Sequence, residues 1–394
     1  MPEDDRSGAQ RALSDPRALP DRGKQPLDPP GPRLDSLTGL RWWAAFAVFV
    51  HHAGNLAPLP IQEHLSFGTY GVTFFFVLSG FVLTWSARTD PGPRPRVFYW
   101  RRFARIYPAH LVALLLAIPV FYAVAPDPAQ WWVKPLDVGV LLLSVVLLQG
   151  WWRDPGVLFS GNPAAWTLSC EAFFYAMHPL VHRGLRRVTH RGALIVAVGV
   201  AAAILLLRVV VLVAPDGPLS AMPWPVLRLG EFVLGMALAR AVRLGWHPRW
   251  HPVWPALALA GVAFWTATAE SVQGELGLLG LVVGPEAVAP RFAPELVVLA
   301  CAGLVTACAL RELDGGARVL RGRTLVRLGE WSYAFYLLHA TVIYALASLC
   351  GRQGTAWGNL GWFVLAAGVS VAAAAALHHG VEKPLERRLR PLVA

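Results

Sequence analysis

The chain has 394 residues, of which 55% are hydrophobic and only 15% are charged. Soluble globular proteins carry about 25% charged residues, so the composition argues against a soluble enzyme, a disordered chain and a disulfide-stapled domain. Lys and Arg outnumber Asp and Glu by 35 to 24, a net charge of +11. Basic cytoplasmic loops of a membrane protein explain that charge without a nucleic-acid partner.

The N-terminal segment, 1–36, is polar and rich in Pro, Arg and Asp. Such a composition cannot bury enough apolar surface to become ordered. No apolar stretch precedes residue 37, so the segment does not have the pattern of a signal peptide. We therefore predict a disordered cytoplasmic tail over 1–36, a membrane domain over 37–380 and a basic cytoplasmic tail over 381–394.

Long apolar segments fill the membrane domain, and several are long enough to cross a hydrocarbon core of about 30 Å. Basic residues gather in alternate connections, which places these connections and both termini in the cytoplasm of a multi-pass cell-membrane protein. Three apolar segments separate the basic clusters at 88–105 and 183–191, where only an even number of crossings is allowed. One segment must therefore re-enter or break, with 154–163 as the expected break, leaving about ten transmembrane helices. The apolar segments are 37–54, 68–86, 106–125, 137–152, 164–182, 192–213, 223–241, 252–268, 293–310, 328–350 and 359–379.

The first apolar segment carries Arg41 and His52, eleven residues apart. In a helix this spacing is about three turns, near one face and about 16 Å along the axis. A neutral imidazole is a natural base for removing a proton from a hydroxyl near pH 7. His51 would point about 100° away from His52. The alternative is a pair of interfacial histidines at the end of a span.

A second basic motif contains Arg102 and Arg105, which share a helix face at i and i+3. Two guanidinium groups entering the bilayer from the cytoplasm can grip phosphates bidentately. The alternative is that both arginines only anchor the helix on the cytoplasmic side.

Other polar residues lie inside apolar segments, where ionisable groups are costly and mark functional sites by default. Glu171 is expected to pair with an arginine, to orient a histidine, or to serve structure alone. His339 either forms part of a second polar wall of a cavity or is a core histidine whose hydrogen bonds are made within the protein. Ser79 and Gly80 stand in a phenylalanine-rich segment, where small residues favour close helix packing over catalysis.

Three further features of the sequence favour a structural interpretation. Arg228 and Glu231, at i and i+3, predict an ion pair within one helix. Arg208 has no evident partner, so it either snorkels or meets an unseen carboxylate. No CxxC spacing is present, so we predict buried thiols with no disulfide framework and no metal site. The cysteines are Cys170, Cys301, Cys308 and Cys350.

Taken together, the motifs resemble those of the integral-membrane acyltransferase 3 family, over about residues 35 to 390. Thr38 stands where the family usually has aspartate, and Ala172 and Phe173 where it often has an acid and a glutamine, so the roles of those side chains do not carry over. The matching motifs, in the family's order, are 37–41 with His52, 74–81, 102–108, 166–171, 332–339 and 382–384.

The resemblance implies O-acyl transfer from a cytoplasmic acyl-coenzyme A, used as co-substrate with no bound cofactor. The residues of these motifs resemble those of the single-domain actinobacterial branch of the family, which includes macrolide and ansamycin O-acyltransferases. This resemblance favours a hydroxyl of a small natural product as acceptor. The alternatives are a cell-surface glycan or lipid-linked sugar as acceptor and, in another class, a transporter, although no internal repeat supports transport. We assign His52 and Glu171 to catalysis, and Arg41, Arg102, Arg105, Ser79 and His339 to substrate binding.

Overall fold

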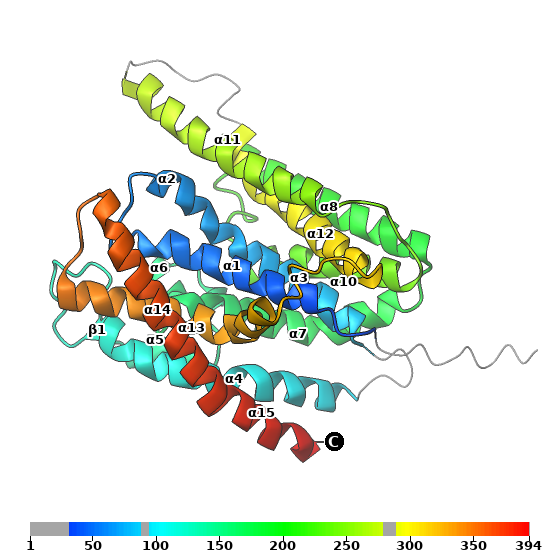
Figure 1. The fold of residues 1–394 in the computed structure, drawn as a ribbon, viewed down its shortest axis with the longest axis horizontal. Helices are drawn as coiled ribbons and strands as arrows, with labels where there is room; N and C mark the ends of the chain where they lie inside the picture. The colour runs from blue at the N-terminus through cyan, green and yellow to red at the C-terminus, as the bar shows by residue number, and fades with distance from the viewer. Residues whose placement is uncertain (1–30, 88–93, 279–288, 394) are drawn as a thin grey trace, which may run out of the picture.

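The computed structural model describes residues 31–87, 94–278 and 289–393. Most of the predicted N-terminal tail and part of the basic connection at 88–105 lie outside these residues. In the described part, regular structure is almost entirely helical, as an all-α membrane protein requires (Figure 1). The sheet found there is a parallel pair of two-residue strands, β1 (Tyr122–Ala123) and β2 (Lys134–Pro135).

Long helices run side by side through the bundle (Figure 1). By length and composition, six helical stretches in the described residues could cross a membrane: 62–85, 95–121, 190–213, 293–313, 323–350 and 357–393. The prediction of about ten crossings therefore stays unconfirmed. The longer helices are α1 (Asp35–Ala53), α3 (Gly71–Trp85), α4 (Pro95–Phe121), α7 (Trp166–Leu185), α8 (His190–Val213), α10 (Leu229–Arg243), α11 (Val253–Leu278), α12 (Ala293–Leu313), α13 (Arg323–Cys350) and α14 (Leu360–Leu377).

The N-terminus of α1 is fixed by a carboxylate from α12. Both Glu312 carboxylate oxygens accept backbone N–H groups of α1, from Asp35 at 3.0 Å and from Ser36 at 2.8 Å. Negative charge is favourable at this end of a helix, whose first amides have no partner within the helix. The helix thus begins at Asp35, so the last two residues of the predicted tail are helical, and Ser36 is fully buried.

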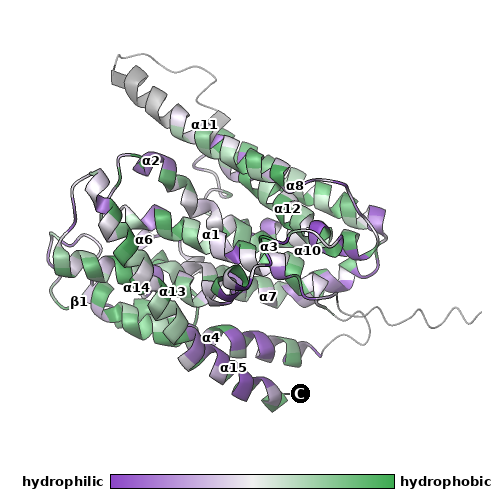
Figure 2. Ribbon diagram, in the orientation of Figure 1, coloured by the Kyte–Doolittle hydropathy of each residue, from purple (hydrophilic) through white to green (hydrophobic). Residues whose placement is uncertain are grey.

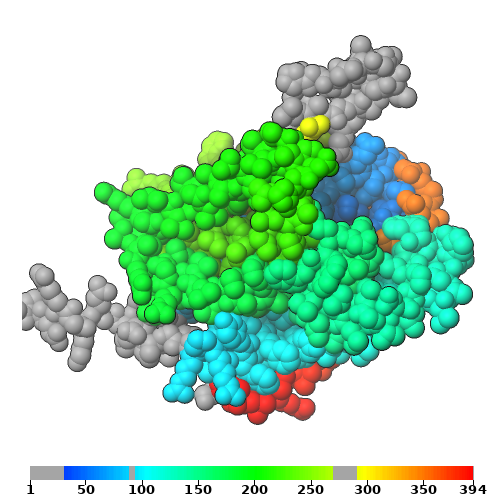
Figure 3. Space-filling model, turned by 180° about the vertical axis from the view of Figure 1, so that it is seen from behind, coloured from blue at the N-terminus to red at the C-terminus, as the bar shows by residue number. Residues whose placement is uncertain are grey.

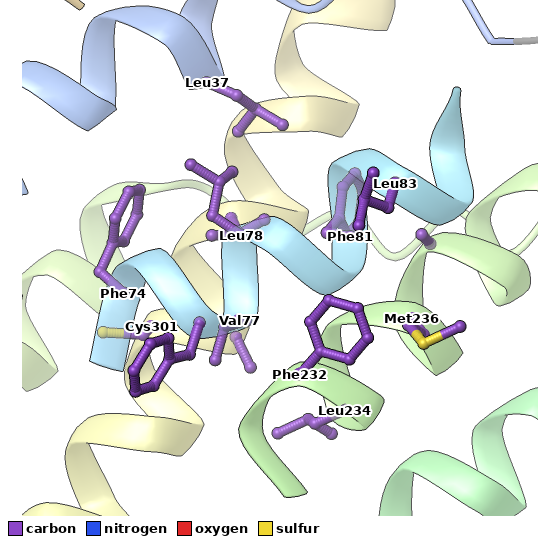
Figure 4. Packing of buried hydrophobic residues seen from close by; sticks show 14 of the residues in the cluster. Leu37, Phe74, Val77, Leu78, Phe81, Leu83, Phe232, Leu234, Met236 and Cys301 are labelled. Atoms are coloured by element: carbon purple, nitrogen blue, oxygen red, sulfur yellow. The ribbon is translucent and has the colours of Figure 1, made fainter. Parts of the chain in front are cut away.

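The apolar core forms two clusters that share α1. In one cluster α3 packs between α10 and α12, and in the other α13 packs against α1, α4 and α14. Figure 4 shows the first cluster, in which side chains of α3 meet those of its neighbours. Its labelled members are Leu37, Phe74, Val77, Leu78, Phe81, Leu83, Phe232, Leu234, Met236 and Cys301.

Two glycines allow α3 and α10 to approach closely. A Cβ added at Gly80 would meet the Phe232 carbonyl oxygen, and one at Gly235 would meet the Val77 carbonyl oxygen. Small residues at such crossings let backbones pack without a void. The close packing predicted from Gly80 is therefore present, and its partner is α10.

The stretch between α4 and α7 is broken into short pieces, as the parity of the basic clusters required. Its longest helix, α5, has eight residues and rises only about 12 Å, far short of a bilayer. Asn162 anchors the stretch by donating to the Leu337 carbonyl at 2.7 Å, and Lys134 Nζ donates to the Phe159 carbonyl at 3.0 Å. Irregular backbone is thus held against protein, which is where it is tolerated. The pieces are α5 (Val138–Val145), η3 (Gln149–Trp151), α6 (Pro155–Leu158) and η4 (Pro163–Ala165).

The remaining elements are short connections and the C-terminal segment. The predicted C-terminal tail is helical and continues from α14 through a π-helical turn; Trp100 on α4 donates to the Leu389 carbonyl at 2.7 Å. This segment therefore packs beside the basic start of α4, where hydrophilic residues gather in Figure 2. These elements are α2 (Gln62–Leu65), η2 (Ser66–Tyr70), α9 (Trp224–Leu227), η6 (Ala289–Phe292), η7 (Trp357–Asn359), η8 (His378–Glu382), α15 (Lys383–Leu389) and η9 (Arg390–Val393).

The outer helices α8, α11 and α14 are rich in apolar residues (Figure 2), and many of these side chains are exposed. Ile195 on α8, Phe264 on α11 and Val364 on α14 are each about two-thirds or more exposed, at 71%, 66% and 67%. A soluble protein rarely exposes such a continuous apolar surface, which is the expected exterior of a protein in lipid.

Candidate active site

A polar cavity of about 110 Å³ lies where α1, α3, α4, α7 and α13 meet. Five of the seven residues predicted for the site line it, although they come from four different helices. They are Arg41 from α1, Ser79 from α3, Arg102 and Arg105 from α4, and Glu171 from α7.

Glu171 is held in this cavity by two hydroxyl groups. Ser79 Oγ donates to Oε1 at 3.1 Å, and Tyr175 OH donates to Oε2 at 3.0 Å. The structure therefore gives Ser79 a polar contact beyond the packing role that the sequence favoured. It shows neither of the partners expected for Glu171: in the described residues no histidine hydrogen bond and no ion pair to this carboxylate is present, although Arg41 and Arg105 line the same cavity.

Three arginines make the cavity strongly positive. Arg102 and Arg105 both line it, as their i, i+3 spacing on α4 predicted, and Arg41 adds a third guanidinium from α1. The buried Nε of Arg102 has no hydrogen-bond partner among the described residues, and its guanidinium carbon lies 5.8 Å from the centre of the Phe98 ring. Several positive charges against one carboxylate leave the site suited to an anionic ligand.

His52 and His339 lie close together, and neither lines this cavity. Their ring centres lie 5.3 Å apart, and His339 lies 5.6 Å from the ring of Tyr336, which does line the cavity. The ring of His51 is 4.7 Å from that of His52, and the His51 Cβ lies 3.2 Å from where a Cβ would stand at Gly68 of η2. The spacing predicted that His52 and Arg41 share one polar face, but only Arg41 lines the cavity.

The tautomer of His339 follows from its hydrogen bond. Nδ1 lies 2.7 Å from the Tyr336 carbonyl oxygen, which can only accept, so Nδ1 carries the proton. In the neutral imidazole Nε2 is then the acceptor, and it is buried without a partner in the described part of the chain. This nitrogen is available to accept a proton or a hydrogen bond beside His52.

Three tyrosines of the site were not predicted from the sequence. Tyr175, Tyr333 and Tyr336 all line the cavity, and Tyr333 OH donates to the Ile106 carbonyl at 2.9 Å, joining α13 to α4. Spacing was the available signal, since Tyr175 follows Glu171 by four residues and Tyr336 precedes His339 by three.

The three features given a structural interpretation above have clear outcomes. Arg228 pairs with Glu231 at 2.8 Å, as predicted, and the unseen carboxylate near Arg208 is Glu295, 3.6 Å away on α12. All four cysteines are free. The expectation that all are buried is wrong for Cys350, which is exposed because it ends α13 rather than lying inside the bundle.

Comparisons with known proteins cover nearly the whole chain. A family model described as an acyltransferase domain matches residues 34–379. Acyltransferase MdmB of Streptomyces mycarofaciens is 35% identical over 389 residues, covering 91% of this chain and 92% of that protein. Nodulation protein 10 of Rhizobium leguminosarum bv. viciae is 26% identical over 373 residues, covering 90% of this chain and 94% of that protein. No solved structure matches.

Proposed function

The chain belongs to this acyltransferase family, and we propose that it transfers an acyl group from acyl-coenzyme A to a hydroxyl of a small natural product, such as a macrolide or its sugar. Membership of this family identifies the chain as an acyltransferase, and its apolar helices indicate that it is a membrane protein. The donor and the acceptor are the proposed part. The observation that carries the proposal is one cavity that gathers three arginines and a hydroxyl-bound carboxylate between membrane helices.

The arginines support a coenzyme A donor. Arg102 and Arg105 stand near the basic start of α4, on the side that the positive-inside rule assigns to the cytoplasm. Guanidinium groups bind phosphates bidentately, so these two residues suit the anionic part of the donor. A cavity of about 110 Å³ holds only part of the donor, so we place the thioester inside it and the phosphates at its cytoplasmic edge, where Arg102 and Arg105 line it.

The proposed chemistry is direct transfer. The acceptor oxygen attacks the thioester carbonyl carbon, the carbon–sulfur bond breaks, and the coenzyme A thiolate leaves. A base takes the hydroxyl proton, which finally protonates the thiolate, so the products are an ester and free coenzyme A. Direct attack needs a base because a hydroxyl is a poor nucleophile at neutral pH.

His52 is the proposed base, and His339 orients it. The Tyr336 carbonyl leaves His339 Nε2 as an acceptor next to the His52 ring. An N–H of His52 donating to that nitrogen would leave the other His52 nitrogen unprotonated and free to take the hydroxyl proton. Glu171, fixed by Ser79 and Tyr175, balances the arginine charge beside the thioester.

Membranes containing the protein, incubated with radiolabelled acetyl-coenzyme A and a panel of hydroxylated macrolides and sugars, test the proposal. We expect one free thiol for each ester formed, and no ester when the reacting hydroxyl of the acceptor is methylated. If the acyl group is transferred only to a cell-surface glycan, the acceptor is a glycan and not a small natural product. Movement of an acceptor across the membrane without thiol release would favour transport and refute the proposal.

A further inference from the structure

A second cavity, of about 360 Å³, lies between α8, α9, α10 and α12. Its volume falls within the range of about 300–1,000 Å³ that small-ligand pockets occupy. Figure 3 shows a recess in the green part of the surface, which contains α8 and the connection after it. Arg153 and Ser220, which line the cavity, lie in connections without basic clusters, so the cavity belongs to the side opposite the cytoplasm.

Residues that line this cavity carry buried hydrogen-bonding groups without partners among the described residues. Glu231 is only 4% exposed; its Oε1 pairs with Arg228 at 2.8 Å, while its Oε2 has no partner in the described residues. Glu295 Oε2 likewise lacks a hydrogen bond there, because Arg208 stays 3.6 Å away. On the donor side, Arg228 Nε is buried and unpartnered in the same part of the chain. Buried polar groups left unpaired are costly, so they point to a ligand that completes them.

Two tryptophans supply an apolar wall beside these groups. Trp166 and Trp224 both line the cavity, with ring centres 5.5 Å apart. Arg153 lies 4.3 Å over the Trp224 ring and donates to the Ser220 carbonyl at 3.2 Å, which fixes the tryptophan's outer face. An aromatic face next to orphan acceptors and an orphan donor suits a ring that is apolar on its faces and polar at its edge.

We propose that this second cavity binds the hydroxyl-rich ring of the acceptor. A hydroxyl both donates and accepts, so a polyhydroxylated ring can satisfy the two carboxylate oxygens and the arginine N–H together. A phosphate would meet the carboxylates as like charges, and a simple cation would leave Arg228 Nε unpaired. The assignment of the ring to an acceptor rests on the function proposed above.

The two cavities share a wall formed by α3. Val72 lines both of them, and Phe76, which lines the arginine cavity, lies under the Arg228 guanidinium at 5.4 Å. Trp166 of the second cavity precedes Thr167 of the first on α7. The proposed ring site therefore adjoins the thioester site, on the side opposite the cytoplasmic mouth through which the donor enters.

Binding of octyl β-D-glucopyranoside tests the inference without any donor. The probe is used below its critical micelle concentration on full-length protein in nanodiscs, with empty nanodiscs subtracted. Octyl tetraethylene glycol ether, which keeps the chain but lacks the ring, is the matched probe. We expect saturable binding of the glucoside alone, weakened at least about tenfold by Glu231→Gln, Glu295→Gln or Trp224→Ala.

Two substitutions outside the cavity serve as controls. Glu330 pairs with Arg33 at the surface, and Trp254 is 68% exposed on α11, so Glu330→Gln and Trp254→Ala should leave glucoside binding unchanged. Glu231→Gln could fail to fold because it disturbs the ion pair with Arg228. In that case the binding measured for Glu295→Gln tests the inference, since the Glu295 carboxylate lies 3.6 Å from Arg208 and is only loosely paired.

Two results overturn the inference: no saturable binding by the unaltered protein, or saturable binding that all three cavity variants retain. The outcome is separate from that of the proposed function. A protein that binds the glucoside but transfers no acyl group refutes the transferase reaction alone, whereas an active transferase without glucoside binding refutes this cavity assignment alone.

Discussion

Arg102→Ala and Arg105→Ala should each impair use of the acyl-coenzyme A donor. Both guanidinium groups line the arginine cavity, whereas neighbouring Arg101 does not. Arg101→Ala is therefore a matched control, because it removes the same charge from the same end of α4 and changes the topology signal equally. We expect the two cavity variants to lose donor affinity and the control to keep it.

The size of the loss follows from the bonds removed. A hydrogen bond to a charged group contributes about 1.5–3 kcal/mol, which corresponds to about tenfold to a hundredfold in kcat/KM for each arginine. The two residues are one helical turn apart and serve one ligand, so the double variant should lose less than the product of the single effects. Initial transfer rates across a range of acyl-coenzyme A concentrations measure this. Equal losses in Arg101→Ala and Arg102→Ala would refute phosphate binding and reduce both arginines to anchors of the helix.

Three further outcomes are expected. His52→Ala should lose about 10²–10⁴-fold in transfer rate while His51→Ala loses much less, because a missing general base costs that much; the reverse order would contradict the assignment of the base. Gly235→Ala should lower the thermal midpoint of the purified protein by forcing α10 away from the Val77 carbonyl, at a cost of about 1–3 kcal/mol, and an unchanged midpoint would show that the helices can separate freely. A reporter fused after the C-terminus should act as cytoplasmic, as the basic clusters require, and periplasmic activity would invert the predicted topology.

Helical character and the broken stretch could be predicted because they depend on local properties of the chain. The length of an apolar segment decides whether it can cross a membrane as a helix. The distribution of arginines decides which connections are cytoplasmic, and so whether the number of crossings between them is even. Together these required a break before α7, and the structure places α5 and α6 there. No information about how helices pack is needed for that step.

The arrangement of the site depends on packing, and sequence captured only part of it. Spacing put Arg102 and Arg105 on one face, which the structure confirms. It could not show that Ser79, on α3, donates to Glu171 on α7, or that His52 lies outside the cavity that Arg41 lines. Such contacts depend on how each helix is rotated about its own axis. Helix packing fixes this rotation, and the apolar pattern of a membrane segment does not reveal it.

The partner of Arg208 shows the same limit at longer range. Glu295 lies 87 positions later in the chain, and only the packing of α12 near α8 brings the two side chains together. A sequence can state that a buried charge needs a partner, because an unpaired charge in a bilayer is costly. Which residue provides it is a property of the fold.

Photolabelling most directly tests the central claim, that acyl-coenzyme A reacts in the arginine cavity. A diazirine-bearing acyl-coenzyme A is irradiated with the full-length protein in membranes, and the labelled peptides are identified by mass spectrometry with and without excess coenzyme A. We predict labels on the segments of α3, α4, α7 and α13 that line the cavity, lost on competition and reduced in the Arg102→Ala and Arg105→Ala double variant. Labels confined to α8, α10 and α12, or unaffected by free coenzyme A, would contradict this account.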